Sequence, residues 1–219
     1  MIQFVDLGRQ YEQIKDEVNA KIQEVIESKA FVQGKYAKQF ETEYAALHGL
    51  KHVTACSSGS CAVLVSVASL GLQPGDEVIT TPHTFIATAE PIVHMKAKPV
   101  FVDIDPDTYN IDVTKIEAAI TPKTKAILPV HIYGNPVNME EIMRIAKKHN
   151  LLVVEDCAHA CFAKYNGRFV GTFGDANAFS FNPGKNLGAY GDAGAIATSD
   201  DKFFTLVNKI YDHGRLSNY

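Results

Sequence analysis

LLVVEDCAHA, residues 151–160, passes from four consecutive apolar residues to two adjacent carboxylates, a pattern typical of a buried strand with polar side chains at its carboxyl end. Further short runs rich in β-forming residues surround it, at residues 52–56, 77–80, 99–102, 126–130, 176–181 and 193–198. Between them, helical segments are predicted near residues 60–70, 84–95, 113–119 and 138–149. This alternation predicts an α/β protein with a mostly parallel mixed sheet flanked by helices.

The N-terminal part has a different pattern. Apolar residues recur at helical spacing over residues 9–28, which predicts an amphipathic helix, and a second helix is expected over residues 35–47. We therefore expect an N-terminal helical segment, residues 1–30, followed by one α/β domain, residues 31–219.

Composition narrows the classes of function. The 219 residues are 46% hydrophobic and 21% charged, which is typical of a soluble globular protein, and the net charge of −4 argues against nucleic-acid binding. No apolar stretch is long enough for a membrane helix, and the first residues lack the apolar core of a signal peptide. We expect a cytoplasmic protein that does not bind a membrane, with its four cysteines as free thiols.

In open α/β sheets, ligands bind beyond the carboxyl ends of the strands, so the residues that follow each strand are the candidates. Residues 57–62, Ser-Ser-Gly-Ser-Cys-Ala, open a helix whose N-terminal N–H groups suit a phosphate, and Ser60 adds a hydroxyl. The alternative is a serine helix cap with nothing bound. The segment lacks the lysine of a Walker A loop, so a nucleotide triphosphatase is not expected.

Two other strand exits carry candidate side chains. Phe85 is suited to stacking on a planar ligand, or else is an ordinary core residue. Asp156 is suited to pairing with a protonated ring nitrogen and His159 to donating a hydrogen bond; the alternative is a helix cap with His159 satisfied locally. Cys157, His159 and Cys161 also invite a zinc interpretation, but their spacing is not that of a zinc motif, and we predict no metal.

The last candidate is Lys185, in the glycine- and proline-bounded turn between the runs at 176–181 and 193–198. Most lysines are solvated, but a desolvated lysine at the edge of a sheet can attack a carbonyl to form a Schiff base. Ser180, on the preceding strand, offers another hydroxyl to a phosphate. These candidates together suit pyridoxal 5′-phosphate (PLP). This cofactor needs a site for its phosphate, an aromatic side chain against its ring, an acid for its ring nitrogen and a lysine that forms a Schiff base.

Four ordered motifs resemble the DegT/DnrJ/StrS family of PLP-dependent sugar aminotransferases. They are PHTFIATA (82–89), HIYGNP (131–136), EDCAHA (155–160) and SFNPGKNLG (180–188), and the resemblance covers essentially the whole chain. It implies the aspartate-aminotransferase architecture (fold type I). Residues 31–219 would form its PLP-binding large domain, and the chain would end before the smaller C-terminal domain of its relatives.

The resemblance also implies roles for individual residues. Lys185 would bind the cofactor covalently, Asp156 would pair with its pyridine nitrogen and Phe85 would stack on its ring. His159 stands where the family usually has a glutamine that contacts the phenolic oxygen, and it can make the same donor contact. The residues that would surround the phosphate are Gly59, Ser60, the amide of Cys61, and Ser180.

The implied activity is transfer of an amino group from an amino acid, glutamate or glutamine, to the keto group of a nucleotide-linked sugar, with the enzyme acting as a homodimer. A relative with dehydratase chemistry replaces the lysine by histidine, so Lys185 favours transamination. Two alternatives stay open: a truncated, inactive PLP-binding or partner-binding fragment, and an aminotransferase that acts on a cyclitol ketone.

Overall fold

The computed structural model describes residues 5–214 and divides the chain into two compact units, residues 1–40 and 41–219. The first unit holds α1 (Leu7–Ser28) and the beginning of α2 (Lys35–His48), which confirms both predicted N-terminal helices. The carboxylate of Asp6 caps α1 by accepting from the N–H of Arg9 at 3.2 Å.

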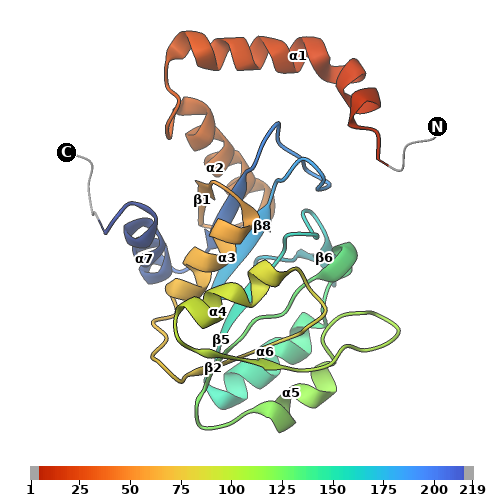
Figure 1. Ribbon diagram of the computed structural model, residues 1–219, viewed down its shortest axis with the longest axis vertical. Helices are drawn as coiled ribbons and strands as arrows, with labels where there is room; N and C mark the ends of the chain where they lie inside the picture. Colours follow the sequence, from red (N-terminus) through yellow and green to blue (C-terminus); the bar gives the residue numbers. More distant parts are fainter. Residues whose placement is uncertain (1–4, 215–219) are drawn as a thin grey trace. The chain divides into compact units, whose positions relative to one another are not determined.

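A sheet forms the centre of the second unit (Figure 1). It has seven strands, in the order β1-β9-β8-β5-β4-β2-β3. β9 is antiparallel to both of its neighbours, and the other adjacent pairs are parallel. The predicted mostly parallel mixed sheet is therefore confirmed. The strands are β1 (His52–Cys56), β2 (Glu77–Thr80), β3 (Lys98–Phe101), β4 (Thr124–Ile127), β5 (Leu152–Asp156), β8 (Ala176–Ser180) and β9 (Gly194–Thr198).

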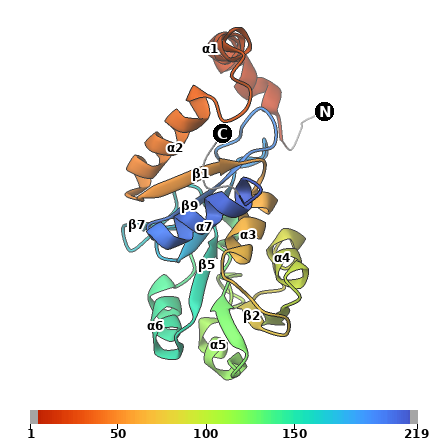
Figure 2. The ribbon, with the colours of Figure 1, turned by 90° about the vertical axis from the view of Figure 1, so that its left-hand side faces the viewer.

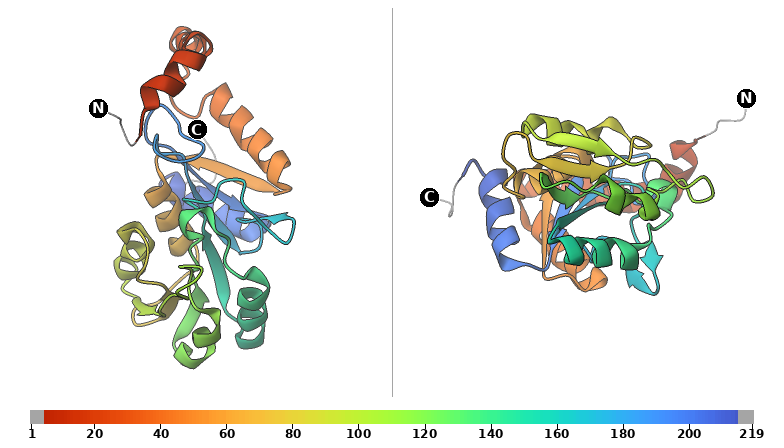
Figure 3. Two further views of the ribbon diagram at one scale, coloured as in Figure 1. Left: turned by 90° about the vertical axis from the view of Figure 1, so that its right-hand side faces the viewer. Right: turned by 90° about the horizontal axis from the view of Figure 1, so that it is seen from below.

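Helices cover both faces of this sheet, as Figures 2 and 3 show. Neighbouring strand residues alternate between two separate cores, because successive side chains of a strand point to opposite faces. Val154 packs in the core beneath α3, α4 and α7, whereas Val153 packs in the core beneath α5 and α6. These helices are α3 (Gly59–Ala68), α4 (Glu90–His94), α5 (Val113–Ala119), α6 (Met139–His149) and α7 (Asp201–Tyr211).

Three segments differ from the sequence expectation. The helix predicted over residues 84–95 is instead a 3₁₀ turn, η1 (Ile86–Thr88), followed by the short α4, and Pro91 lies in the first turn of α4. α7 was not predicted, although Asp200 is a good N-cap for it. The hairpin of β6 (Lys164–Tyr165) and β7 (Arg168–Phe169) was also missed; its Asn-Gly turn is the signal that identifies it. Over residues 5–214, no helix combines the length and apolar character needed to cross a membrane.

Candidate active site

A cavity of about 300 Å³ lies where the exits of several strands meet. Seven of the eight predicted site residues line it, although they are up to 126 positions apart in the chain (185 − 59 = 126). They are Gly59, Ser60, Phe85, Asp156, His159, Ser180 and Lys185. Cys61 is the one predicted residue that does not line it.

The N-terminus of α3 forms one wall. Ser58 caps the helix in an extended conformation, and its Oγ accepts from the N–H of Cys61 at 3.1 Å. The Cys61 amide, which was expected to bind a phosphate, therefore has a partner within the chain. Of the residues predicted in this turn, Gly59 and Ser60 line the cavity, together with the cap residue Ser58.

Gly59 is required by the close approach of α3 to β8. A Cβ atom added at Gly59 would lie 2.5 Å from the Cβ of Ser180. We expect Gly59→Ala to lower the free energy of unfolding by about 1–3 kcal/mol and to weaken phosphate binding, because the helix terminus must move away from the strand. Denaturant unfolding and titration with PLP measure the two effects. Ser60→Ala is the control; it should weaken PLP binding with a change of no more than about 0.5 kcal/mol in stability, since Ser60 is exposed.

Asp156 ends β5 and is only 5% exposed. Its Oδ2 accepts from the hydroxyl of Thr88 at 2.8 Å, and its Oδ1 accepts from the N–H of Ala158 at 3.0 Å. The hydroxyl of Thr84 donates in turn to that of Thr88 at 2.7 Å. These neutral donors orient the carboxylate without neutralising it, which leaves it suited to a cationic ligand atom. Sequence reasoning missed Thr88, because it lies 68 residues away in the chain.

The loop that carries Lys185 is fixed at two points. The side-chain amide of Asn182 donates to Asp192 Oδ1 at 3.0 Å, and the side-chain amide of Asn186 donates to the carbonyl of Cys161 at 2.6 Å. Asn182 and Asp192 also line the cavity. Neither residue was predicted as part of the site. Lys185 therefore lies in a turn that two side-chain hydrogen bonds hold in place, on the same cavity wall as Asp156.

Burial and charge act in opposite directions on Lys185. Burial lowers the pKa of this lysine below its usual value of 10.5, while the nearby carboxylate of Asp156 raises it. Burial also lowers the pKa of His159, Lys185 lowers it further, and Asp156 again opposes the shift. The site thus favours a neutral imidazole and a lysine that loses its proton more readily than usual.

These shifts predict a pH dependence. The neutral amine of Lys185 should become reactive at a lower pH than that of an ordinary lysine. Asp156→Asn should shift the pH profile of Lys185 reactivity to still lower pH, because it removes the interaction that raises the pKa of the lysine. Reductive methylation by formaldehyde, measured on the Lys185 peptide by mass spectrometry across a pH series, tests this, with the peptide of exposed Lys123 as internal reference. A shift of the variant's profile to higher pH would contradict the prediction.

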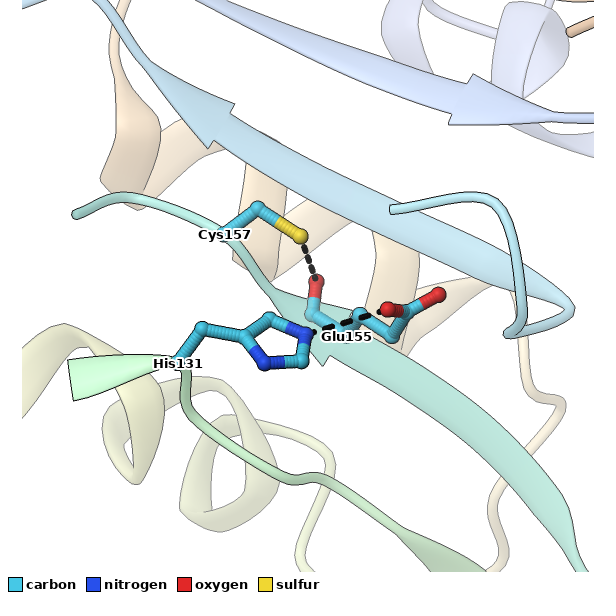
Figure 4. A group of neighbouring side chains, drawn as sticks. All are labelled: His131, Glu155 and Cys157. Atoms are coloured by element: carbon cyan, nitrogen blue, oxygen red, sulfur yellow. Dashed lines mark hydrogen bonds and ion pairs between the residues drawn. The ribbon is translucent and has the colours of Figure 1, made fainter. Parts of the chain in front are cut away.

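The three residues of the zinc interpretation, Cys157, His159 and Cys161, have separate partners. Cys157 lies beside His131 and Glu155, and the possible ligand atoms of these three residues are within 4.8 Å of one another (Figure 4). His159 instead accepts from the N–H of Tyr133, and the thiol of Cys161 contacts the hydroxyl of Tyr44 at 3.2 Å.

The buried cluster in Figure 4 is a hydrogen-bond network. His131 accepts from the N–H of Val137 through Nδ1 at 3.0 Å, so Nε2 carries the hydrogen that it donates to Glu155 at 3.0 Å. Glu155 also accepts from three backbone N–H groups, those of residues 171, 173 and 174, at 2.7–2.8 Å. Because both nitrogens and both carboxylate oxygens already have partners, this cluster fits a structural role better than metal binding.

The cavity fits PLP. Its volume of about 300 Å³ is at the lower end of the range for small-molecule sites, and the buried carboxylate of Asp156 and the half-buried Lys185 share its wall. Phe85 is 69% exposed and lines the cavity, so its ring surface is available to a planar ligand.

Comparison with known proteins gives a consistent result. Residues 12–219 match the model of the DegT/DnrJ/EryC1/StrS aminotransferase family. The chain is 50% identical to a pleiotropic regulatory protein of Geobacillus stearothermophilus and 44% identical to a UDP-N-acetyl-3-dehydro-alpha-D-glucosamine 3-aminotransferase of Acidithiobacillus ferrooxidans, in each case over 100% of this chain and 59% of the relative. The structure of S. venezuelae DesV in complex with a ketimine intermediate superimposes with a TM-score of 0.95 at 39% identity, over 100% of this chain and 59% of that one. The chain thus spans about 59% of the length of these relatives.

Proposed function

Because this chain belongs to the DegT/DnrJ/EryC1/StrS aminotransferase family, we propose that it binds PLP and takes part in the transfer of an amino group from an amino acid to a keto sugar linked to a nucleotide. The observation that carries the proposal is the presence of Lys185 and Asp156 on the wall of one cavity. The relative from A. ferrooxidans, named as a 3-aminotransferase of a UDP-linked sugar, supports this class of acceptor.

Bound PLP supplies an electron sink for the charge that develops when a Cα proton leaves. Asp156 would hold a proton at the pyridine nitrogen by charge pairing. The amine of Lys185 would bind the cofactor, and once displaced it would take the proton from Cα and return it elsewhere. The neutral hydrogen-bond donors around Asp156 keep the carboxylate in place for this role.

The remaining lining residues would hold the cofactor in place. Phe85 would cover one face of the ring, and His159 would donate to the phenolic oxygen. The phosphate would bind at the N-terminus of α3, next to Gly59 and Ser60, with Ser180 on its other side.

We further propose glutamate or glutamine as the amino donor and a homodimer as the assembly. Two-fold dimers are the commonest soluble assembly, and the apolar side chains of Phe85, which lines the cavity, and the adjacent Ile86 are 69% and 59% exposed. Sedimentation at micromolar concentration tests the assembly; a strictly monomeric profile would contradict it.

A second candidate is a PLP-binding or partner-binding chain that does not turn over. The observation that favours it is that the chain spans about 59% of the length of its relatives. Steady release of amino sugar by the purified chain would exclude this candidate.

The first test of the proposed function is an absorption spectrum with added PLP, before and after borohydride. We expect a visible band that borohydride converts into a permanent mass increase on the Lys185 peptide, because a lysine bound to PLP is reduced to a stable amine. Lys185→Ala is the control and should show neither signal. A wild-type chain without the band would contradict the proposed function.

A further inference from the structure

We propose that Tyr133 is a positioning residue: its backbone N–H holds the ring of His159 in the form that carries the hydrogen on Nε2. The inference rests on the proposed function, in which His159 donates a hydrogen bond to bound PLP.

The direction of one hydrogen bond determines the tautomer. The N–H of Tyr133 points to Nδ1 of His159 across 3.4 Å. A backbone N–H can only donate, so Nδ1 must be the unprotonated nitrogen, and a neutral imidazole then carries its single hydrogen on Nε2. Burial and Lys185 both favour the neutral ring, as described above. His159 therefore keeps a donor available for a ligand oxygen.

The backbone of Tyr133 is held in a conformation that is costly for a residue with a side chain. Its φ is +56°, in the left-handed region, and such a residue persists only where its surroundings enforce it. Its hydroxyl lies 3.2 Å from Nε2 of His83, and its ring stacks on that of His159 at a centroid distance of 6.3 Å. The N–H of the preceding Ile132 points to Oδ1 of Asn110 at 3.3 Å. Both ends of the residue are thus fixed.

The same turn, η2 (Ile132–Gly134), is anchored beside β5. The N–H of His131 donates to the carbonyl of Asp156 at 3.1 Å, and the ring of His131 is bound to Glu155 in the buried network of Figure 4. Gly134 has a φ of +80°, and a Cβ atom there would lie 3.2 Å from the carbonyl of His159. The turn therefore lies directly against the segment that carries His159.

The hydroxyl of Tyr133 is the part of this arrangement that a substitution can remove without disturbing the core, because the residue is 68% exposed. We expect Tyr133→Phe to free the ring from His83, to loosen the turn, and to raise the Kd for PLP by about 3- to 10-fold. Tyr109→Phe is the matched control: its ring lies 6.3 Å from that of Tyr133, and within the described part of the chain its hydroxyl has no hydrogen-bond partner. It should leave the Kd unchanged.

A double-mutant cycle separates positioning from a general structural effect. In a His159→Leu background, Tyr133→Phe should change the Kd by less than about twofold, since leucine offers neither an acceptor to the Tyr133 N–H nor a donor to PLP. An equal rise in both backgrounds would overturn the proposal.

The decisive second readout needs no cofactor. In protein with ¹⁵N-labelled histidine, the signals absent from His159→Gln belong to His159, and we expect an unprotonated Nδ1 and a protonated Nε2 in the wild type, with a mixture in Tyr133→Phe. A hydrogen on Nδ1 in the wild type would overturn the proposal. If the wild type fails to bind PLP, the proposed function fails, and the ¹⁵N spectrum still decides whether Tyr133 sets the tautomer.

Discussion

Glu155→Ala is expected to lower the free energy of unfolding by about 3–5 kcal/mol, the largest stability effect that we predict. The side chain is fully buried and accepts from His131 and from three backbone N–H groups between residues 171 and 174. Its removal leaves those donors buried without partners, and each carries a desolvation cost. Denaturant unfolding followed by circular dichroism measures the loss.

Two further variants make this prediction specific. Glu155→Gln should also be destabilising, because its amide NH₂ must face at least one N–H donor whichever way it is turned. Glu140→Ala, at an exposed site in the first turn of α6, should cost no more than about 1 kcal/mol. If Glu155→Ala lowered the free energy of unfolding by no more than this surface control, the contacts of Glu155 would not stabilise the fold as we predict.

Asp156→Asn is expected to raise the Kd for PLP by about 10- to 150-fold, which corresponds to the loss of a charge-assisted hydrogen bond of about 1.5–3 kcal/mol. The neighbouring Glu155 faces the buried network, so Asp156 is the carboxylate at the end of β5 that meets the cavity. Fluorescence titration with PLP gives the Kd.

Thr88→Val is the matched control for Asp156→Asn. It removes the hydroxyl that donates to Asp156 Oδ2 at 2.8 Å but leaves the carboxylate charge. We expect a rise in Kd of no more than about 10-fold, since a neutral donor contributes less than a charge pair. A larger effect for Thr88→Val than for Asp156→Asn would mean that orientation, and not charge, dominates the contribution of Asp156.

The sequence alone established the class of fold and seven of the residues that line the cavity. Strand and helix periods differ, so the seven runs of β-forming residues could be separated from the helices between them. All seven correspond to strands, and the largest difference in a bound is three residues, at the carboxyl end of β4. Because the carboxyl ends of parallel strands meet at one edge of a sheet, the sequence predicted that Lys185 and Asp156 share one site.

Only the tertiary structure decided which groups within those segments face the cavity and what holds them there. The sequence shows Glu155 and Asp156 as adjacent carboxylates; the alternation of the strand sends the first into a buried network and the second to the cavity. The hydroxyl of Thr88 donates to Asp156, which lies 68 positions away in the chain. The backbone N–H of Tyr133 donates to His159, which lies 26 positions away. Local spacing carries information about a residue's own element, whereas such partners are set by how elements pack, and so they could be seen only in the folded chain.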